Sequence, residues 1–134
     1  SQIEILKDYE ERPPLVAGNA GKLQQVLTNL ILNARDAMAQ GGTITLRTIL
    51  DGDRIRVEVA DTGEGIPQEN LSKIFDPFFT TKAVGSGTGL GLAVTYGIVQ
   101  EHGGTIEAKS PNGSGATFVL TLPIGAPAQA RLAG

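Results

Sequence analysis

The chain has 134 residues, of which 40% are hydrophobic and 19% are charged, and its net charge is −3. This composition is typical of one globular domain and excludes a disordered chain. The absence of cysteine excludes disulfides and thiolate metal sites, and the mixed charges argue against nucleic acid as the main partner. No apolar run approaches the ~18 residues of a membrane span, so we expect a cytoplasmic domain without direct membrane contact, although the full-length protein could be membrane-anchored.

The first half of the chain predicts a strand, a helix and a hairpin. Residues 3–9 have strand character, which ends at the Arg12-Pro13-Pro14 break, and residues 15–17 could add a short second strand. A helix is expected from residue 18 or 19 to about Gln40, where two glycines stop it. Two alternating segments then flank the turn Asp51-Gly52-Asp53; they are residues 43–50 and 54–61.

The second half predicts one short helix, one long helix and a closing strand pair. The expected elements are a helix over 68–75, an irregular loop over 76–89, a helix over 90–104 with its glycine stop, and strands over 105–110 and 116–123. Residues 125–134 have the composition of a tail or linker. Together these elements predict an α/β sandwich over residues 1–124, in which a mixed, largely antiparallel sheet carries helices on one face.

The first predicted helix carries an unusual polar stripe. At ~100° per residue one narrow face gathers six polar side chains, which are Lys22, Gln25, Asn29, Asn33, Asp36 and Gln40. A solvated face would account for the stripe, but long charged side chains would stabilise such a face better than asparagine does. An amide oxygen is a good neutral ligand for a hard cation such as Mg²⁺, which favours a binding role for Asn29 and Asn33.

A first glycine cluster, DTGEG, follows directly on the strand that ends at Asp61. Asp and Gly are common in any turn from a strand to a helix. An ionised carboxylate at a strand end can also accept a hydrogen bond from the exocyclic amine of adenine, and would select adenine over guanine. Gly63 and Gly65 would then let the backbone approach the base closely.

A second glycine cluster, GSGTGLGL, occupies residues 85–92 directly before the second long helix. Alternate glycines ahead of a helix offer free N–H groups to an anion such as phosphate. Neither a Walker motif nor a dinucleotide fingerprint is present. A flexible linker is disfavoured because Leu90, Leu92 and Val94 require packing, so phosphate binding is favoured.

The segment between the two clusters, KIFDPFFTTK, contains three phenylalanines that are more typical of a core or a lid anchor than of base stacking. Lys82 could reach nucleotide phosphates, although a solvated lysine is an equal alternative. His102, the only histidine, is expected to cap helix carbonyls rather than to act in catalysis.

Four segments in this order, NLILNARDAM, DTGEGIP, FDPFFTTK and GSGTGLGLAV, resemble the conserved boxes of sensor histidine kinase catalytic domains. The resemblance extends from about residue 3 to residue 124. It implies the Bergerat-type ATP-binding fold that these kinases share with DNA gyrase, heat-shock chaperones and mismatch-repair ATPases, with a mobile ATP lid over residues 76–88.

The resemblance also implies residue roles. Asn33 would be the Mg²⁺ ligand, Asn29 and Lys82 would act beside it in catalysis, and Asp61 would bind the adenine amine. The remaining ATP-binding positions would be Asp36, Gly63, Gly65, Ile66, Gly87, Thr88, Gly89, Leu90, Gly91 and Thr117.

Two positions depart from related patterns. The chaperone-type ATPases place a glutamate, as general base, where this chain has Asn29, and an amide cannot take a proton. Many histidine kinases place lysine or arginine where this chain has Asp36, so Arg35 or Lys82 could supply the phosphate-facing charge. A water-hydrolysing ATPase and an anti-sigma-factor serine kinase of the same fold are the alternatives, and a degenerate scaffold without nucleotide is a third.

The expected function is therefore that of the catalytic domain of a two-component histidine kinase, with ATP and Mg²⁺ as ligands. Its partners would be a histidine-bearing dimerisation hairpin of the same full-length protein and a downstream response regulator. Because strand character begins at residue 3, we expect the hairpin to lie upstream and the chain alone not to phosphorylate itself.

Overall fold

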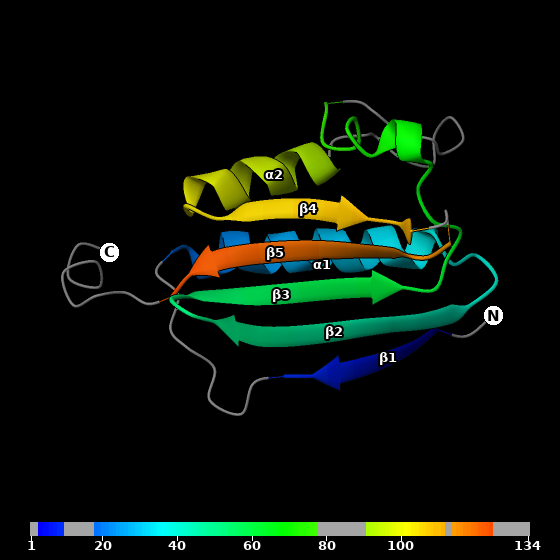
Figure 1. Cartoon of the computed structure of the whole chain (residues 1–134), viewed down its shortest axis with the longest axis horizontal. Coiled ribbons are helices and arrows are strands. Elements are labelled where there is room, and N and C mark those ends of the chain that lie inside the picture. Colours follow the sequence, from blue (N-terminus) through cyan, green and yellow to red (C-terminus); the bar gives the residue numbers. More distant parts are fainter. Residues whose placement is uncertain (1–2, 10–17, 78–90, 112–113, 125–134) are drawn as a thin grey trace.

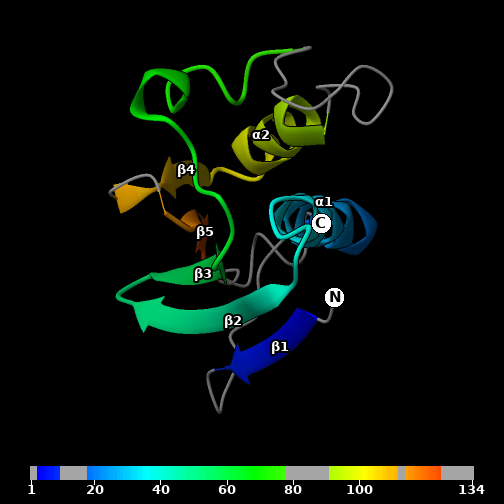
Figure 2. The same cartoon turned by 90° about the vertical axis from the view of Figure 1, so that its right-hand side faces the viewer.

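The computed structural model describes residues 3–9, 18–77, 91–111 and 114–124. Five strands form one mixed sheet in the order β1-β2-β3-β5-β4, and α1 and α2 pack on the same face of it (Figure 1, Figure 2). The predicted α/β sandwich is confirmed. The elements are β1 (Ile3–Asp8), α1 (Ala20–Asp36), β2 (Gly42–Asp51), β3 (Arg54–Asp61), the 3-10 helix η1 (Gln68–Asn70), α2 (Gly91–Glu101), β4 (Thr105–Lys109) and β5 (Ala116–Pro123).

The sheet is mixed because β1 runs parallel to β2, whereas the other neighbouring strands are antiparallel. The predicted hairpin is confirmed, and Gly52 adopts φ +65° in its turn. The register of β3 with β5 sets Asp61, the last residue of β3, opposite Ala116, the first residue of β5.

Helix α1 begins at an asparagine cap, because Asn19 has an extended backbone and its side chain accepts a hydrogen bond of 2.9 Å from the N–H of Lys22. The helix ends at Asp36, before the expected Gln40. The carbonyl of Ala37 accepts from the N–H of Glu64, and the N–H of Gly41 donates to Met38 at 2.8 Å. The chain therefore turns after Asp36, because these groups are not available for another helical turn.

The core lies between the helices and the inner face of the sheet. Phe118 of β5 is 2% exposed, and the ring of Phe75 packs against it edge-on at 6.3 Å. Burial of this apolar surface is the main force that holds the helices on the sheet. The largest fully buried apolar side chains are Phe118, Leu30, Ile44, Val26, Val59 and Val99.

The short helix expected over 68–75 is only partly confirmed. Only η1 is helical, and the chain then continues in tight turns. In these turns the N–H of Lys73 donates to the carbonyl of Asn70, and the N–H of Asp76 donates to the carbonyl of Lys73. No side chain caps η1, so a longer helix gains little here. The possible strand over 15–17 and most of the loop over 76–89 lie outside the described residues. Among the described residues, no helix has the length and apolar character that a membrane span requires.

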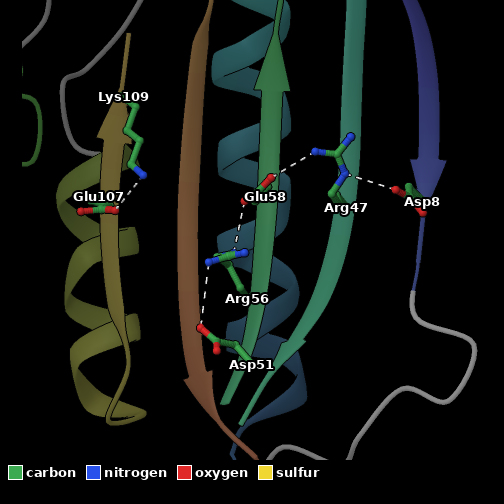
Figure 3. Close-up of polar contacts among 7 residues, drawn as sticks. All are labelled: Asp8, Arg47, Asp51, Arg56, Glu58, Glu107 and Lys109. Carbon is green, nitrogen blue, oxygen red and sulfur yellow. Dashed lines mark hydrogen bonds and ion pairs between the residues drawn. The ribbon is translucent and has the colours of Figure 1, made fainter. Parts of the chain in front are cut away.

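The face of the sheet away from the helices carries paired charges (Figure 3). Arg47 of β2 lies between Asp8 of β1 and Glu58 of β3, at 3.2 and 3.5 Å. Arg56 reaches Glu58 at 3.3 Å and Asp51 at 4.0 Å. Opposite charges that face each other across strands stabilise a solvated sheet face, so this face has a structural explanation.

Candidate functional site

The site predicted from sequence centres on Asp61, which ends β3 and is 7% exposed. Its Oδ1 accepts a hydrogen bond of 2.8 Å from the N–H of Gly63. Its Oδ2 is buried and has no hydrogen-bond partner among the described residues. Because a buried, unpaired carboxylate oxygen is costly, this atom is the best evidence for a ligand that donates a hydrogen bond.

Burial raises the pKa of the Asp61 carboxyl above its ordinary value of 3.8, although the N–H groups of Gly63 and Ala116 act in the opposite direction. The nearby charge of Glu64 adds to the increase. A donor bound at Oδ2 would favour the ionised form and lower the pKa again. A hydrogen-bond donor at Oδ2 would therefore stabilise the ionised form of Asp61, which burial disfavours.

The loop after Asp61 packs closely against the residue that follows α1 and the residue that precedes β5. This close packing explains the glycine at position 63. An added Cβ there would lie 2.4 Å from the carbonyl oxygen of Ala37. The carbonyl of Gly63 accepts from the N–H of Gly115 at 2.9 Å, and Gly65 adopts φ +81°. The first glycine cluster thus meets a backbone requirement and fixes the position of the carboxylate.

Two residues that support Asp61 could not be found from sequence. The hydroxyl of Ser110 is buried, accepts from the N–H of Ile66 at 2.8 Å and donates to the carbonyl of Gly115 at 2.6 Å. Gly115 adopts φ +68°, and an added Cβ would lie 2.7 Å from the carbonyl oxygen of Asp61. The weak available signal was the S-P-N-G-S-G segment, which reads only as a turn.

The strand register does not favour the contribution to the adenine site that the sequence predicts for Thr117. Thr117 pairs with Ala60, whereas Ala116 pairs with Asp61. Because side chains alternate along a strand, Thr117 lies on the face opposite to Asp61, and Ala116 shares the face of the carboxylate.

Asn29 and Asn33, two members of the polar stripe of α1, are both half-buried. The Nδ2 of Asn29 donates to the carbonyl oxygen of Gly91 at 3.3 Å and to Oγ1 of Thr95 at 3.2 Å. Asn29 therefore links α1 to the first turn of α2. Within the described part of the chain, the side chain of Asn33 makes no hydrogen bond.

The structure describes only some of the other predicted positions. Asp36 is exposed at the end of α1 and lies 3.6 Å from the guanidinium of Arg35. Gly91 begins α2, and the space where a Cβ would lie is open. The remaining phosphate-facing candidates, Lys82, Gly87, Thr88, Gly89 and Leu90, lie outside the described residues.

His102 caps the end of α2, in agreement with the structural role expected for it. Its Nδ1 lies 2.8 Å from the carbonyl of Ile98, and its Nε2 accepts from the N–H of Asn19 at 3.0 Å. Since the Ile98 carbonyl can only accept, Nδ1 carries the proton. The described residues contain no group of three His, Cys, Asp or Glu side chains that could hold a metal ion.

Comparison with known proteins assigns the family. The model of the histidine kinase-, DNA gyrase B-, and HSP90-like ATPase family matches residues 18–126. The chain belongs to this family. Its residue order and its fold are those of a histidine kinase catalytic, ATP-binding domain, as three relatives illustrate.

The sensor kinase CckA of Brucella abortus is 48% identical over 136 aligned residues, which cover 90% of this chain and 14% of CckA. The catalytic domain of histidine kinase ThkA is 34% identical with a TM-score of 0.80, over 91% of this chain and 80% of that one. Full-length ShkA in complex with AMPPNP is 32% identical with a TM-score of 0.80, over 93% of this chain and 26% of ShkA. The chain spans about a quarter or less of the curated relatives that it matches.

Proposed function

We propose that this domain binds Mg²⁺-ATP and donates the γ-phosphoryl group to a histidine on a dimerisation hairpin of the same full-length protein. A response regulator would then take the phosphoryl group from that histidine. The cytoplasm, where ATP is available, would be its compartment. The proposal that the domain binds a nucleotide rests on the unpaired Oδ2 of Asp61.

Asp61 would accept a hydrogen bond from the adenine amine through Oδ2. Since Oδ1 is already held by the N–H of Gly63, the carboxylate would need little reorganisation on binding. Guanine carries a carbonyl oxygen in place of this amine, so it would leave two acceptors facing each other. This arrangement supports selection of ATP over GTP.

Asn33 would supply an amide oxygen to Mg²⁺, which binds with one or two protein oxygens and fills its shell with phosphate and water. The bound ion would neutralise charge on the phosphates, since phosphoryl transfer depends mostly on positioning and charge stabilisation. Asp36, Lys82 and the glycines of the second cluster remain phosphate-facing candidates on the sequence pattern.

Hydrolysis of ATP by this chain alone is disfavoured by Asn29. A neutral amide cannot take a proton from water, and the amide nitrogen of Asn29 is engaged by α2. The γ-phosphoryl group would therefore stay on ATP until a histidine acceptor is present.

A calorimetric titration tests the nucleotide part. The wild-type chain should give a saturating heat with Mg²⁺-ATP, a weaker response with GTP and no continuing heat. Asp61→Asn should weaken ATP binding about 10- to 100-fold, the usual effect of losing a hydrogen bond to a charged group. Asp51→Asn, a matched change on the exposed hairpin end, should leave binding unchanged. Absence of binding by two methods would contradict the proposal.

A labelling experiment tests the acceptor. With γ-labelled ATP, we expect stable label on a separately supplied dimerisation hairpin and none on the isolated domain. Steady release of phosphate without the hairpin would instead favour a water-hydrolysing ATPase. Label on a serine of an added protein would favour the serine kinase alternative.

A further inference from the structure

The contact between the two long helices contains one buried polar group besides its apolar side chains. Thr95 of α2 is 0% exposed, and buried Ile98 and Val99 follow it in the same helix. Its Oγ1 lies 3.2 Å from Nδ2 of Asn29 on α1. A hydroxyl at such a position needs a hydrogen-bond partner.

Thr95 does not require Asn29 for that purpose. A threonine in a helix can donate its hydroxyl proton to the carbonyl four residues earlier, which here is the carbonyl of Gly91. A purely structural explanation is therefore available for Thr95. It does not explain why an asparagine on the neighbouring helix donates both to this hydroxyl and to the Gly91 carbonyl.

The Gly91 carbonyl determines how the Asn29 amide is turned. A backbone carbonyl can only accept, so the NH₂ end of the amide must face it. Thr95 accepts from the same nitrogen, and both protons of the amide are then engaged. Only Oδ1 of Asn29 is left, and no hydrogen bond engages it within the described part of the chain.

We propose that Thr95 is a positioning residue for Asn29. Together with the Gly91 carbonyl it holds the amide nitrogen, so that Asn29 serves the nucleotide site as a fixed hydrogen-bond or cation acceptor through Oδ1 and not as a donor to phosphate. This inference rests on the proposed nucleotide site. An amide at this position could act as a donor or as an acceptor, and the inference assigns Asn29 the acceptor role.

The amide signals of Asn29 test the positioning directly and without nucleotide. In ¹⁵N–¹H spectra, assigned by their loss in Asn29→Ala, the two side-chain protons should be well separated and exchange slowly with water. Thr95→Val keeps the shape of the buried side chain and removes the hydroxyl, so it should bring the two signals closer and speed their exchange. Thr95→Ser should restore the wild-type pattern. Exposed Thr28→Val should change nothing. Wild-type signals that already behave like those of a free asparagine would overturn the proposal.

A mutant cycle on Mg²⁺-ATP affinity tests the link to the site. Thr95→Val should weaken binding about 3- to 10-fold, as expected for one lost hydrogen bond, and Thr95→Ser should recover most of it. In an Asn29→Ala background, Thr95→Val should have no further effect, because its target is gone. Equal losses in both backgrounds would overturn the positioning role.

The two tests separate the inference from the proposed function. If the wild-type chain does not bind ATP, the proposed function fails, while the amide signals still decide whether Thr95 holds Asn29. If ATP binds and the signals of Thr95→Val match the wild type, only the positioning role fails.

Discussion

Two regions of the same sheet carry charged side chains in opposite ways. On the face away from the helices, Arg47 and Arg56 each lie between two carboxylates, and every charge shown there has a partner (Figure 3). At the end of β3, Asp61 is more deeply buried than any of them and one of its oxygens has no partner in the described residues. The Nε of Arg56 is also buried without a hydrogen bond, but it lies 3.3 Å from a carboxylate oxygen of Glu58. Within the described residues, Oδ2 of Asp61 has neither a hydrogen bond nor an opposite charge beside it. A buried carboxylate oxygen without any partner therefore distinguishes the end of β3 from the paired face.

The largest effect is expected where the loop that carries Asp61 is packed most tightly. Gly63→Ala should lower the free energy of unfolding by at least about 2 kcal/mol, because its Cβ would meet the Ala37 carbonyl oxygen at 2.4 Å. Gly97→Ala, in α2 with open space around it, is the matched control and should instead stabilise by about 0.5–1 kcal/mol. Urea denaturation measures both. A Gly63→Ala variant as stable as the wild type would contradict the packing described.

The pH dependence of stability is the next prediction. Because the folded-state pKa of Asp61 is raised above 3.8, the folded state holds this proton more tightly than the unfolded state does. Ionisation of Asp61 therefore costs stability, and the cost develops as the pH rises from below 3.8 through the raised folded pKa. The stability of Asp61→Asn relative to the wild type should increase over that window. Urea denaturation of both proteins between pH 3.5 and pH 7, in the range of ordinary carboxyl titration, measures this difference. A difference that stays constant would show that Asp61 is not penalised by burial.

The smallest effect is expected on the paired face. Arg47→Met should change the free energy of unfolding by no more than about 1 kcal/mol, because exposed ion pairs contribute little. Both Arg47 and Asp8 are substantially exposed. The affinity for Mg²⁺-ATP should be unchanged, as calorimetry can check. A loss of affinity comparable to that of Asp61→Asn would erase the contrast between the two regions.

Much of the fold could be predicted from sequence because the signals are local. Alternation predicted the β2–β3 hairpin, and an amphipathic pattern beginning at residue 18 or 19 predicted α1. The end of α1 could not be predicted, because it depends on a hydrogen bond between Ala37 and Glu64. Tertiary contacts of this kind leave no mark in the residues around position 37.

Sequence could propose site residues where a motif names them, but it could not give the positions that register or a distant contact decides. Asp61 and Gly63 followed from the glycine cluster and the strand before it. Sequence alone could not show that Thr117 lies on the face opposite to Asp61, because one step in register moves a side chain to the other face. Ser110 and the link between Asn29 and Thr95 join segments far apart in the chain, so only the structure brings them together.

The central claim is that Oδ2 of Asp61 accepts a hydrogen bond from the exocyclic amine of adenine. The most direct test compares the affinities of wild type and Asp61→Asn for ATP and for the purine nucleoside triphosphate that lacks the amine. We predict that removing the amine weakens binding to the wild type about 10-fold or more, and that the same removal has little effect on Asp61→Asn. An equal loss in both proteins would mean that the carboxylate and the amine do not meet, and the assignment of Asp61 would be wrong.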